Sequence, residues 1–137
     1  MRTLRPGGLI IADNVVQRPD TRDIVYLKHE CPWSLRFLVF LTEAGLLSQF
    51  QVVRYVPDAP GAEAIRALLE AGTGKAPAYP TVERPDGSFA SDSGALIEAY
   101  AAAHGIDRDR LIALDLYERG VLVAQMRMFQ ELRALRG

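Results

Sequence analysis

Cysteine is almost absent from this chain: of 137 residues, only Cys31 carries a thiol. One cysteine cannot form an internal disulfide, which excludes the small disulfide-stapled folds of secreted proteins. The chain also lacks an excess of either charge, with 16 Lys and Arg residues against 17 Asp and Glu and a formal net charge of -1. Such a surface does not favour binding to the phosphates of nucleic acid, so nucleic acid is not an expected partner.

Long apolar runs are missing as well. The apolar segment nearest the N-terminus reads GGLIIADNVV and is interrupted by Asp13 and Asn14, so it is too short to span a bilayer and does not resemble a signal peptide. The 137 residues, 49% of them hydrophobic, can form one globular core. Because a lone free thiol suits a reducing compartment, we expect a soluble cytoplasmic protein without a membrane partner.

The first part of the apolar pattern predicts a strand followed by a helix. Residues 24–27 read IVYL, a β-branched and aromatic run that is typical of a buried strand. From Pro32 onward, Leu35 and Leu38 follow helical spacing, and Gly45 predicts the end of the helix. The only cysteine lies in the turn between these two elements.

The same alternation continues downstream. A second strand is predicted at residues 50–56 (FQVVRYV) and a second helix at residues 61–72. Residues 79–91 contain two short extended pieces around a Pro-Asp-Gly turn, which is typical of a β-hairpin. A third helix is predicted from the capping residues at 91–93 to Gly105. The predicted order is therefore βαβαββα.

The expected fold class is α/β, with a mixed four-stranded sheet and helices on both of its faces. Residues 23–106 contain these elements, residues 1–22 form an N-terminal extension, and residues 107–137 form a helical C-terminal extension. Gly120 interrupts the last segment, which predicts a bend or break there. Since the apolar residues of this segment exceed what one helix can cover, we expect part of its surface to be buried in a homodimer.

Cys31 is the candidate reactive group. A free cysteine is often a buried apolar side chain, and that structural interpretation stands as the alternative. If Cys31 caps the helix and Pro32 occupies its first position, the free N–H groups of the first turn face the sulfur. This arrangement favours the thiolate, since cysteines at helix N-termini have pKa values below the ordinary value of about 8.5. Arg36, one turn further along, is interpreted as solvated surface charge.

Three motifs resemble those of glutaredoxins and of the N-terminal domain of cysteine-type glutathione transferases. The first is YLKHECPWS, in which Lys28 precedes a Cys-Pro-aromatic sequence. The second, YPTVE, is similar to the segment in which a cis proline precedes the third strand, and the third, SDSGALIEAYA, to the acidic-serine pair that opens the last helix. The resemblance covers residues 23–106 and implies a thioredoxin-like fold. The LDLYERGVL segment also resembles the first helix of a transferase's C-terminal domain.

This resemblance implies a glutathione site with a single reactive cysteine. Cys31 would be the catalytic thiol, and Ser34 replaces the second cysteine of dithiol glutaredoxins. Glutathione would contact the residues at the other matched positions, which are Lys28, Trp33, Tyr79, Pro80, Asp92 and Ser93. Asp92 and Ser93 would bind the γ-glutamyl end, and the backbone of Tyr79 would bind the cysteinyl part.

The expected function is glutathione-dependent monothiol exchange at Cys31. In this reaction a small-molecule or protein disulfide is reduced, or a glutathionyl group is removed from a glutathionylated substrate. The alternative is a catalytically idle transferase-like module that binds glutathione or a partner. Iron-sulfur cluster binding between two monomers is less favoured, because Pro32 and Trp33 depart from the Cys-Gly-Phe-Ser pattern of the cluster-binding glutaredoxins. Conjugation of bulky electrophiles is also less favoured, since the acceptor site of the transferases is built largely from a C-terminal helical domain not found here.

A shorter resemblance involves the N-terminal segment LRPGGLIIADNV, which is similar to a piece of the catechol-type O-methyltransferases. An Asp-Asn pair in those enzymes helps to bind a metal ion, and Asp13 and Asn14 occupy its places here. Because no Rossmann half surrounds the segment, we expect no metal site at this pair. An extra strand or a mobile arm is the alternative role for these residues.

Overall fold

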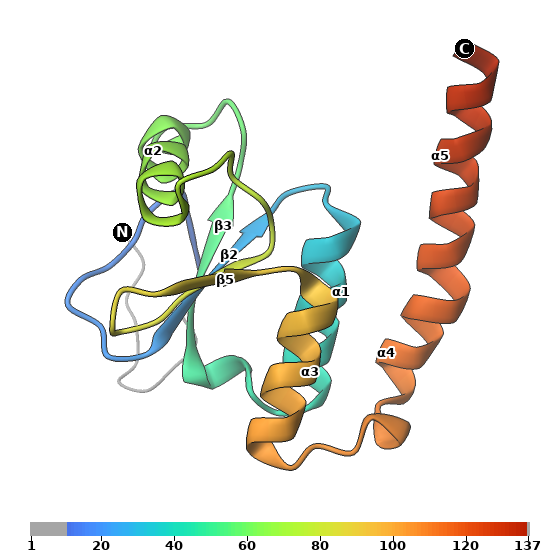
Figure 1. The fold of residues 1–137 in the computed structure, drawn as a ribbon, viewed down its shortest axis with the longest axis horizontal. Coiled ribbons are helices and arrows are strands. Elements are labelled where there is room, and N and C mark those ends of the chain that lie inside the picture. The colour runs from blue at the N-terminus through green and yellow to red at the C-terminus, as the bar shows by residue number, and fades with distance from the viewer. Residues whose placement is uncertain (1–10, 137) are drawn as a thin grey trace.

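The fold is built around one sheet, described by a computed structural model that covers residues 11–136 (Figure 1). The sheet has five strands in the order β1-β3-β2-β4-β5. Their bounds are β1 Ile11–Asp13, β2 Asp23–Lys28, β3 Phe50–Tyr55, β4 Thr81–Glu83 and β5 Phe89–Ser91. β3 is parallel to β1 and β2, whereas β4 is antiparallel to β2 and β5. The predicted thioredoxin-like α/β fold is confirmed, and β1 adds a fifth strand at the edge of the four predicted ones.

Three helices cover the sheet where the sequence predicts helices. They are α1 Pro32–Glu43, α2 Ala62–Thr73 and α3 Ser93–His104. α1 and α3 are followed by Gly45 and Gly105, whose φ values of 77° and 63° lie in the left-handed region that glycine adopts without strain. α2 continues past the predicted end at Gly72, and Gly74, with a φ of 74°, caps it instead.

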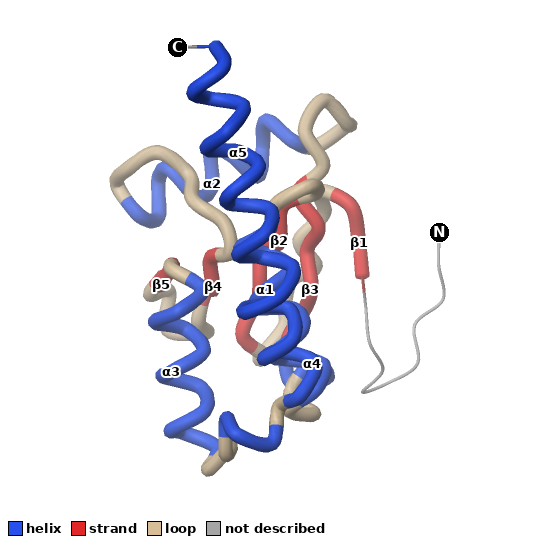
Figure 2. Tube along the Cα trace, turned by 90° about the vertical axis from the view of Figure 1, so that its right-hand side faces the viewer, coloured by secondary structure: helices blue, strands red, loops and turns tan. Residues whose placement is uncertain are grey.

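The alternation of side chains along β2 separates two apolar layers. Val25 and Leu27 belong to a core cluster that includes side chains of α1 and α3. Ile24 and Tyr26 belong to a second cluster, with Ile65 of α2. Because neighbouring residues of a strand point to opposite faces, α1 and α3 cover one face of the sheet and α2 covers the other (Figures 1 and 2).

The buried face of α1 differs from the one that its leucine spacing indicates. Phe37, Phe40 and Leu41 are fully buried, and the rings of Phe37 and Phe40 stack with their centroids 6.1 Å apart. Leu35, in contrast, is 45% exposed. The larger aromatic side chains therefore fill the core, and Leu35 faces a groove on the other side of the helix.

Asp13 and Asn14 connect the N-terminal extension to the sheet. β1 pairs with β3, and Asp13 Oδ1 accepts a hydrogen bond of 2.8 Å from Arg54 Nε. The buried Asn14 amide bonds both backbone groups of Val56: its Nδ2 donates to the carbonyl oxygen at 2.9 Å, and its Oδ1 accepts from the N–H at 3.0 Å. Of the two alternative roles for the N-terminal residues, the extra strand is observed at Ile11–Asp13, and residues 1–10 lie outside the described part of the chain.

The last segment is helical and contains an irregular turn. It consists of α4 Ile112–Leu116, a π-helical turn η3 at Tyr117–Leu122 and α5 Val123–Arg136. η3 includes Gly120, so the predicted interruption takes the form of a π-helical turn. α5 extends away from the sheet, and Leu132 and Leu135 on it are exposed (Figure 1). None of the helices within residues 11–136 is long and apolar enough to cross a membrane.

The buried Tyr26 and the partly buried Tyr100 make the fold sensitive to high pH. Tyr26 Oη donates to Glu83 Oε1 at 2.7 Å, and Tyr100 Oη donates to Asp23 Oδ2 at 2.6 Å. Burial raises the pKa of Tyr26 and of Tyr100 above the ordinary 10.0, and the carboxylate partners raise it further. A phenol whose pKa is raised by folding stabilises the fold below the unfolded-state value, and this stabilisation is lost as pH rises through the folded-state value.

We therefore expect the free energy of unfolding, measured by urea denaturation, to fall as the pH rises above 10.0. Tyr100→Phe should show a smaller fall, because the phenyl ring has no proton to lose. A free energy of unfolding that does not change in this pH range would contradict the prediction. So would ionisation of Tyr100 at the ordinary pKa while the protein is still folded, taken from the difference in tyrosinate absorbance between the wild type and Tyr100→Phe.

Candidate functional site

Three loops meet at one edge of the sheet. β4 is antiparallel to β2, with Thr81 opposite Tyr26, and β5 returns antiparallel to β4, with Ser91 opposite Thr81. The end of β2, the start of β4 and the end of β5 therefore share an edge. The three motifs of the sequence occupy the adjoining loops, so the fold gathers them from distant positions in the chain.

Cys31 caps the N-terminus of α1. Its backbone is extended, with φ -115° and ψ 115°, and Pro32 begins the helix. The Ser34 N–H donates a hydrogen bond to Cys31 Sγ at 3.4 Å. The predicted helix cap is thus confirmed, and both the N–H donor and the positive end of the helix interact favourably with a negatively charged sulfur. Cys31 is partly exposed, which leaves the sulfur accessible to a dissolved reactant.

The Tyr79–Pro80 peptide bond lies beside the sulfur and is cis, as the YPTVE motif implies. Cys31 Sγ is 3.9 Å from the carbonyl oxygen of Tyr79. The Tyr79 ring stacks on Tyr55, with centroids 4.9 Å apart, and its buried hydroxyl has no hydrogen-bond partner among residues 11–136. Burial raises the pKa of Tyr79, so the hydroxyl stays protonated at neutral pH. It is the backbone of Tyr79 that borders Cys31.

Ser34 and Lys28 are joined by a contact that the sequence does not reveal. The buried Ser34 hydroxyl accepts a hydrogen bond of 2.9 Å from the backbone N–H of Lys28. This bond holds the end of β2 against the first turn of α1 and so fixes the loop that carries Cys31. The side chain of Lys28 is exposed. Its contact at the site is made by its backbone.

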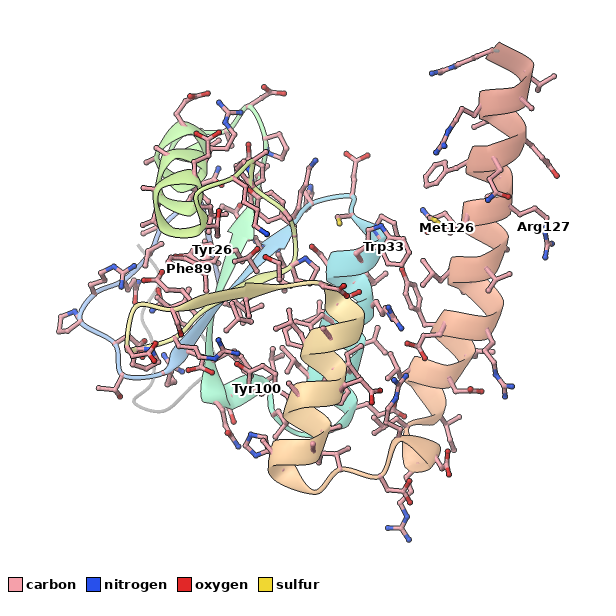
Figure 3. The ribbon with its side chains drawn as sticks, viewed as in Figure 1. Tyr26, Trp33, Phe89, Tyr100, Met126 and Arg127 are labelled. Atoms are coloured by element: carbon pink, nitrogen blue, oxygen red, sulfur yellow. The ribbon has the colours of Figure 1, made fainter. Side chains whose placement is uncertain are left out.

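Trp33 lies where the start of α1 faces α5. Its side chain lines a hollow together with residues that include Met126 and Arg127, and it lies on the side of α1 that faces α5, whereas Arg127 points away from α1 (Figure 3). Trp33 is 40% exposed, and Cys31 beside it is partly exposed as well. The indole therefore does not bury the sulfur.

Asp92 and Ser93 are found at the start of α3. Asp92 Oδ1 accepts a hydrogen bond of 3.2 Å from the Ala95 N–H. The φ of Asp92 is 81°, a conformation that residues other than glycine rarely adopt and that is frequent at functional sites. Asp92 is exposed and Ser93 is buried. The pair offers a carboxylate and a helix N-terminus to a ligand at the same edge as Cys31.

Arg36 is not the solvated charge that its sequence position indicates. Its side chain is 22% exposed and forms an ion pair with Glu118, in which Nε lies 2.7 Å from Oε2. Its Nη1 donates to Ser93 Oγ at 3.3 Å. Glu118 also pairs with Arg108 at 2.7 Å, and Arg108 pairs with Glu98. The interpretation of Arg36 as solvated surface charge was wrong. Its ion-pair partner Glu118 lies 82 positions further along the chain, so the local sequence pattern does not reveal the pair.

A groove of about 980 Å³ opens beside Cys31, between the start of α1 and the segment from η3 to α5. Its walls are mainly apolar and include Leu35, Leu38, Val121 and Phe129. The sequence does not predict this groove, because it forms between segments that are far apart in the chain. The sulfur therefore borders both the sheet edge with the three motifs and an apolar groove.

Tyr117 connects η3 to the start of α1 at the groove. Its buried hydroxyl donates to the carbonyl oxygen of Pro32 at 2.7 Å. Burial raises the pKa of Tyr117, electrostatic interaction with the nearby Cys31 side chain raises it further, and Arg36 acts in the opposite direction. Tyr117 therefore stays protonated at neutral pH and keeps η3 attached to the first turn of α1.

The candidate reactive group of the site is one thiol, which has polar groups on one side and an apolar groove on the other. Within the part of the chain that the structure describes, no group of three or more His, Cys, Asp and Glu side chains could hold a metal ion. The thiol caps a helix and is bordered by a carbonyl group, an exposed carboxylate and an apolar groove.

Compared with known proteins, the chain matches no protein-family model and no curated protein.

Proposed function

We propose that the protein is a glutathione-dependent monothiol oxidoreductase, in which Cys31 exchanges a glutathionyl group with small-molecule or protein disulfides. The observation that carries the proposal is the position of Cys31 Sγ, 3.4 Å from the Ser34 N–H and 3.9 Å from the Tyr79 carbonyl oxygen. Partly exposed cysteines at helix N-termini are typical of reactive thiols. The resemblance of the surrounding motifs to those of glutaredoxins supports the same chemistry.

The reaction has two balanced steps. First, the Cys31 thiolate attacks the glutathione sulfur of a glutathionylated substrate. A bond forms between the two sulfurs, the substrate disulfide breaks, and the substrate leaves as a thiolate that takes a proton from water. Second, the thiolate of another glutathione attacks this mixed disulfide, which releases oxidised glutathione and restores Cys31. The substrate is reduced and glutathione is oxidised.

Glutathione would bind along the sheet edge that carries the motifs. The backbone of Tyr79 would pair with the cysteinyl part as a strand edge does. Asp92 and Ser93 would bind the α-amino and α-carboxylate groups of the γ-glutamyl end. The positive φ of Asp92, 81°, supports a role in binding, because such backbone conformations concentrate at ligand sites.

A second candidate is a module that binds glutathione or a second copy of the chain without turnover. The observation that favours it is the exposure of Met128, Leu132 and Leu135 on α5. Apolar surface of this kind is commonly covered by a partner, and the homodimer expected from the sequence would cover it. In such a module Cys31 would not exchange disulfides.

Intact mass spectrometry after incubation with oxidised glutathione distinguishes the two candidates. We expect the native protein to gain one glutathionyl group, which reduced glutathione then removes. Cys31→Ala is the control, because the chain has no other cysteine. Modification that requires denaturant, or no modification at all, would contradict the oxidoreductase and favour the module.

A further inference from the structure

A charged network lies directly behind the proposed γ-glutamyl site. Arg36 of α1 contacts Ser93 on one side and Glu118 on the other, and Arg108 pairs with the same Glu118. The side chains of Arg36 and Glu118 are 22% and 17% exposed. Charges this far from water are costly unless they are paired and hydrogen-bonded, so the network holds Arg36 in one place.

The direction of the hydrogen bond between Arg36 and Ser93 follows from their chemistry. A guanidinium group has only donors, so Nη1 must donate to Ser93 Oγ, which lies 3.3 Å away. The Ser93 hydroxyl is therefore an acceptor in this bond, and its own proton remains free. Among residues 11–136, Arg36 is the partner that the structure gives for this hydroxyl.

We infer that Arg36 is a positioning residue that directs the Ser93 O–H toward the α-carboxylate of the γ-glutamyl group. This inference rests on the proposed function and names what the site selects: thiols and disulfides that carry a γ-glutamyl group. A hydroxyl that accepts a hydrogen bond from a cation becomes a better donor, because linked hydrogen bonds polarise one another. Arg36 thus acts through Ser93 and does not itself touch the ligand.

Glu118 orients the Arg36 side chain and partly offsets its positive charge. Glu118 Oε2 accepts a hydrogen bond of 2.7 Å from Arg36 Nε, which leaves Nη1 to donate to Ser93 Oγ. Its negative charge also offsets the positive charge that Arg36 would present to an anion. Glu118→Gln keeps an acceptor oxygen for Nε but removes the negative charge, so the site should attract a carboxylate at least as strongly as before.

The variants Arg36→Met and Glu118→Gln distinguish two roles of Arg36, positioning of the Ser93 hydroxyl and support of the fold. Each variant breaks the same ion pair, but only Arg36→Met removes the donor to Ser93. The measurement is the rate of mixed-disulfide formation at Cys31, followed by intact mass. With oxidised glutathione, we expect Arg36→Met to react about tenfold more slowly, the effect of weakening one charge-assisted hydrogen bond. Glu118→Gln should react at the wild-type rate or faster. With the disulfide of cysteinylglycine, which lacks the γ-glutamyl group, Arg36→Met should react like the wild type.

Ser93→Ala and the double variant Arg36→Met/Ser93→Ala complete the test. If Arg36 acts through Ser93, the double variant should be no slower than Ser93→Ala. The inference is wrong, while the proposed function stands, if the two losses add or if Arg36→Met slows both disulfides equally. It is also wrong if Glu118→Gln is as slow as Arg36→Met, or if the wild type does not distinguish the two disulfides. If the wild type reacts with neither disulfide, the proposed function fails, and the inference fails with it.

Discussion

Cys31→Ser should abolish the reduction of glutathionylated substrates, measured as turnover in the presence of reduced glutathione. A serine hydroxyl is not ionised at neutral pH and cannot form a disulfide, so no residual exchange is expected. Serine is also a good helix cap and can accept the Ser34 N–H that contacts Cys31 Sγ at 3.4 Å. The variant should therefore fold with nearly wild-type stability, and the loss can be assigned to the sulfur.

Ser34→Ala is the matched comparison, because it alters the neighbouring side chain and leaves the thiol in place. The substitution removes the hydroxyl that accepts the Lys28 N–H, and a hydrogen-bonding group left without a partner costs about 1 to 3 kcal/mol of stability. Exchange should remain measurable. Turnover by Cys31→Ser would disprove the monothiol mechanism, and an inactive but folded Ser34→Ala protein would show that the hydroxyl takes part in the chemistry.

Asp92→Asn should weaken glutathione binding by about 1.5 to 3 kcal/mol, the range for a hydrogen bond to a charged group. The carboxylate of Asp92 is expected to pair with the α-amino group of glutathione, and the amide removes that charge. Asparagine also caps helices well and tolerates positive φ, which matters because the φ of Asp92 is 81°. Calorimetry of glutathione binding measures the effect, and thermal unfolding should show little change.

Asp107→Asn is the control for this substitution. Asp107 is also an exposed cap, and its Oδ1 accepts a hydrogen bond of 3.0 Å from the Asp109 N–H. It precedes the short 3-10 helix Arg108–Arg110, outside the three loops of the site. Asp107→Asn should bind glutathione like the wild type. Equal affinity of Asp92→Asn and the wild type would remove Asp92 from the proposed site.

The order of strands and helices could be predicted because its signals are local. Pro32 marks the start of α1, and Gly45 and Gly105 follow helices at positions where φ is positive. The cap at Cys31 was predictable for the same reason, since it depends on a Cys-Pro pair beside an apolar helical pattern. The strand β1 was harder to assign, because three residues give little periodicity.

The motifs indicated the cis Tyr79–Pro80 bond beside Cys31, but the contacts between α1 and the C-terminal segment could not be predicted, because they join residues that are distant in the sequence. Arg36 and Glu118 are 82 positions apart, and Tyr117 and Pro32 are 85 apart. The groove has the same origin, since its walls come from α1 and from the segment that contains η3 and α5. A charge pattern along one helix does not show which of its members will meet a partner elsewhere in the chain.

The short strand β1 affects intermolecular strand pairing at the edge of the sheet. An edge strand with free N–H and C=O groups can pair with the sheet of a neighbouring molecule and start aggregation. β1 covers β3 along Val52, Val53 and Arg54, and beyond its end the Asn14 amide takes up both backbone groups of Val56. The Asn14 side chain thus continues the role of the strand and protects β3, and the edge on this side of the sheet is β1 itself, whose three residues offer little length for intermolecular strand pairing.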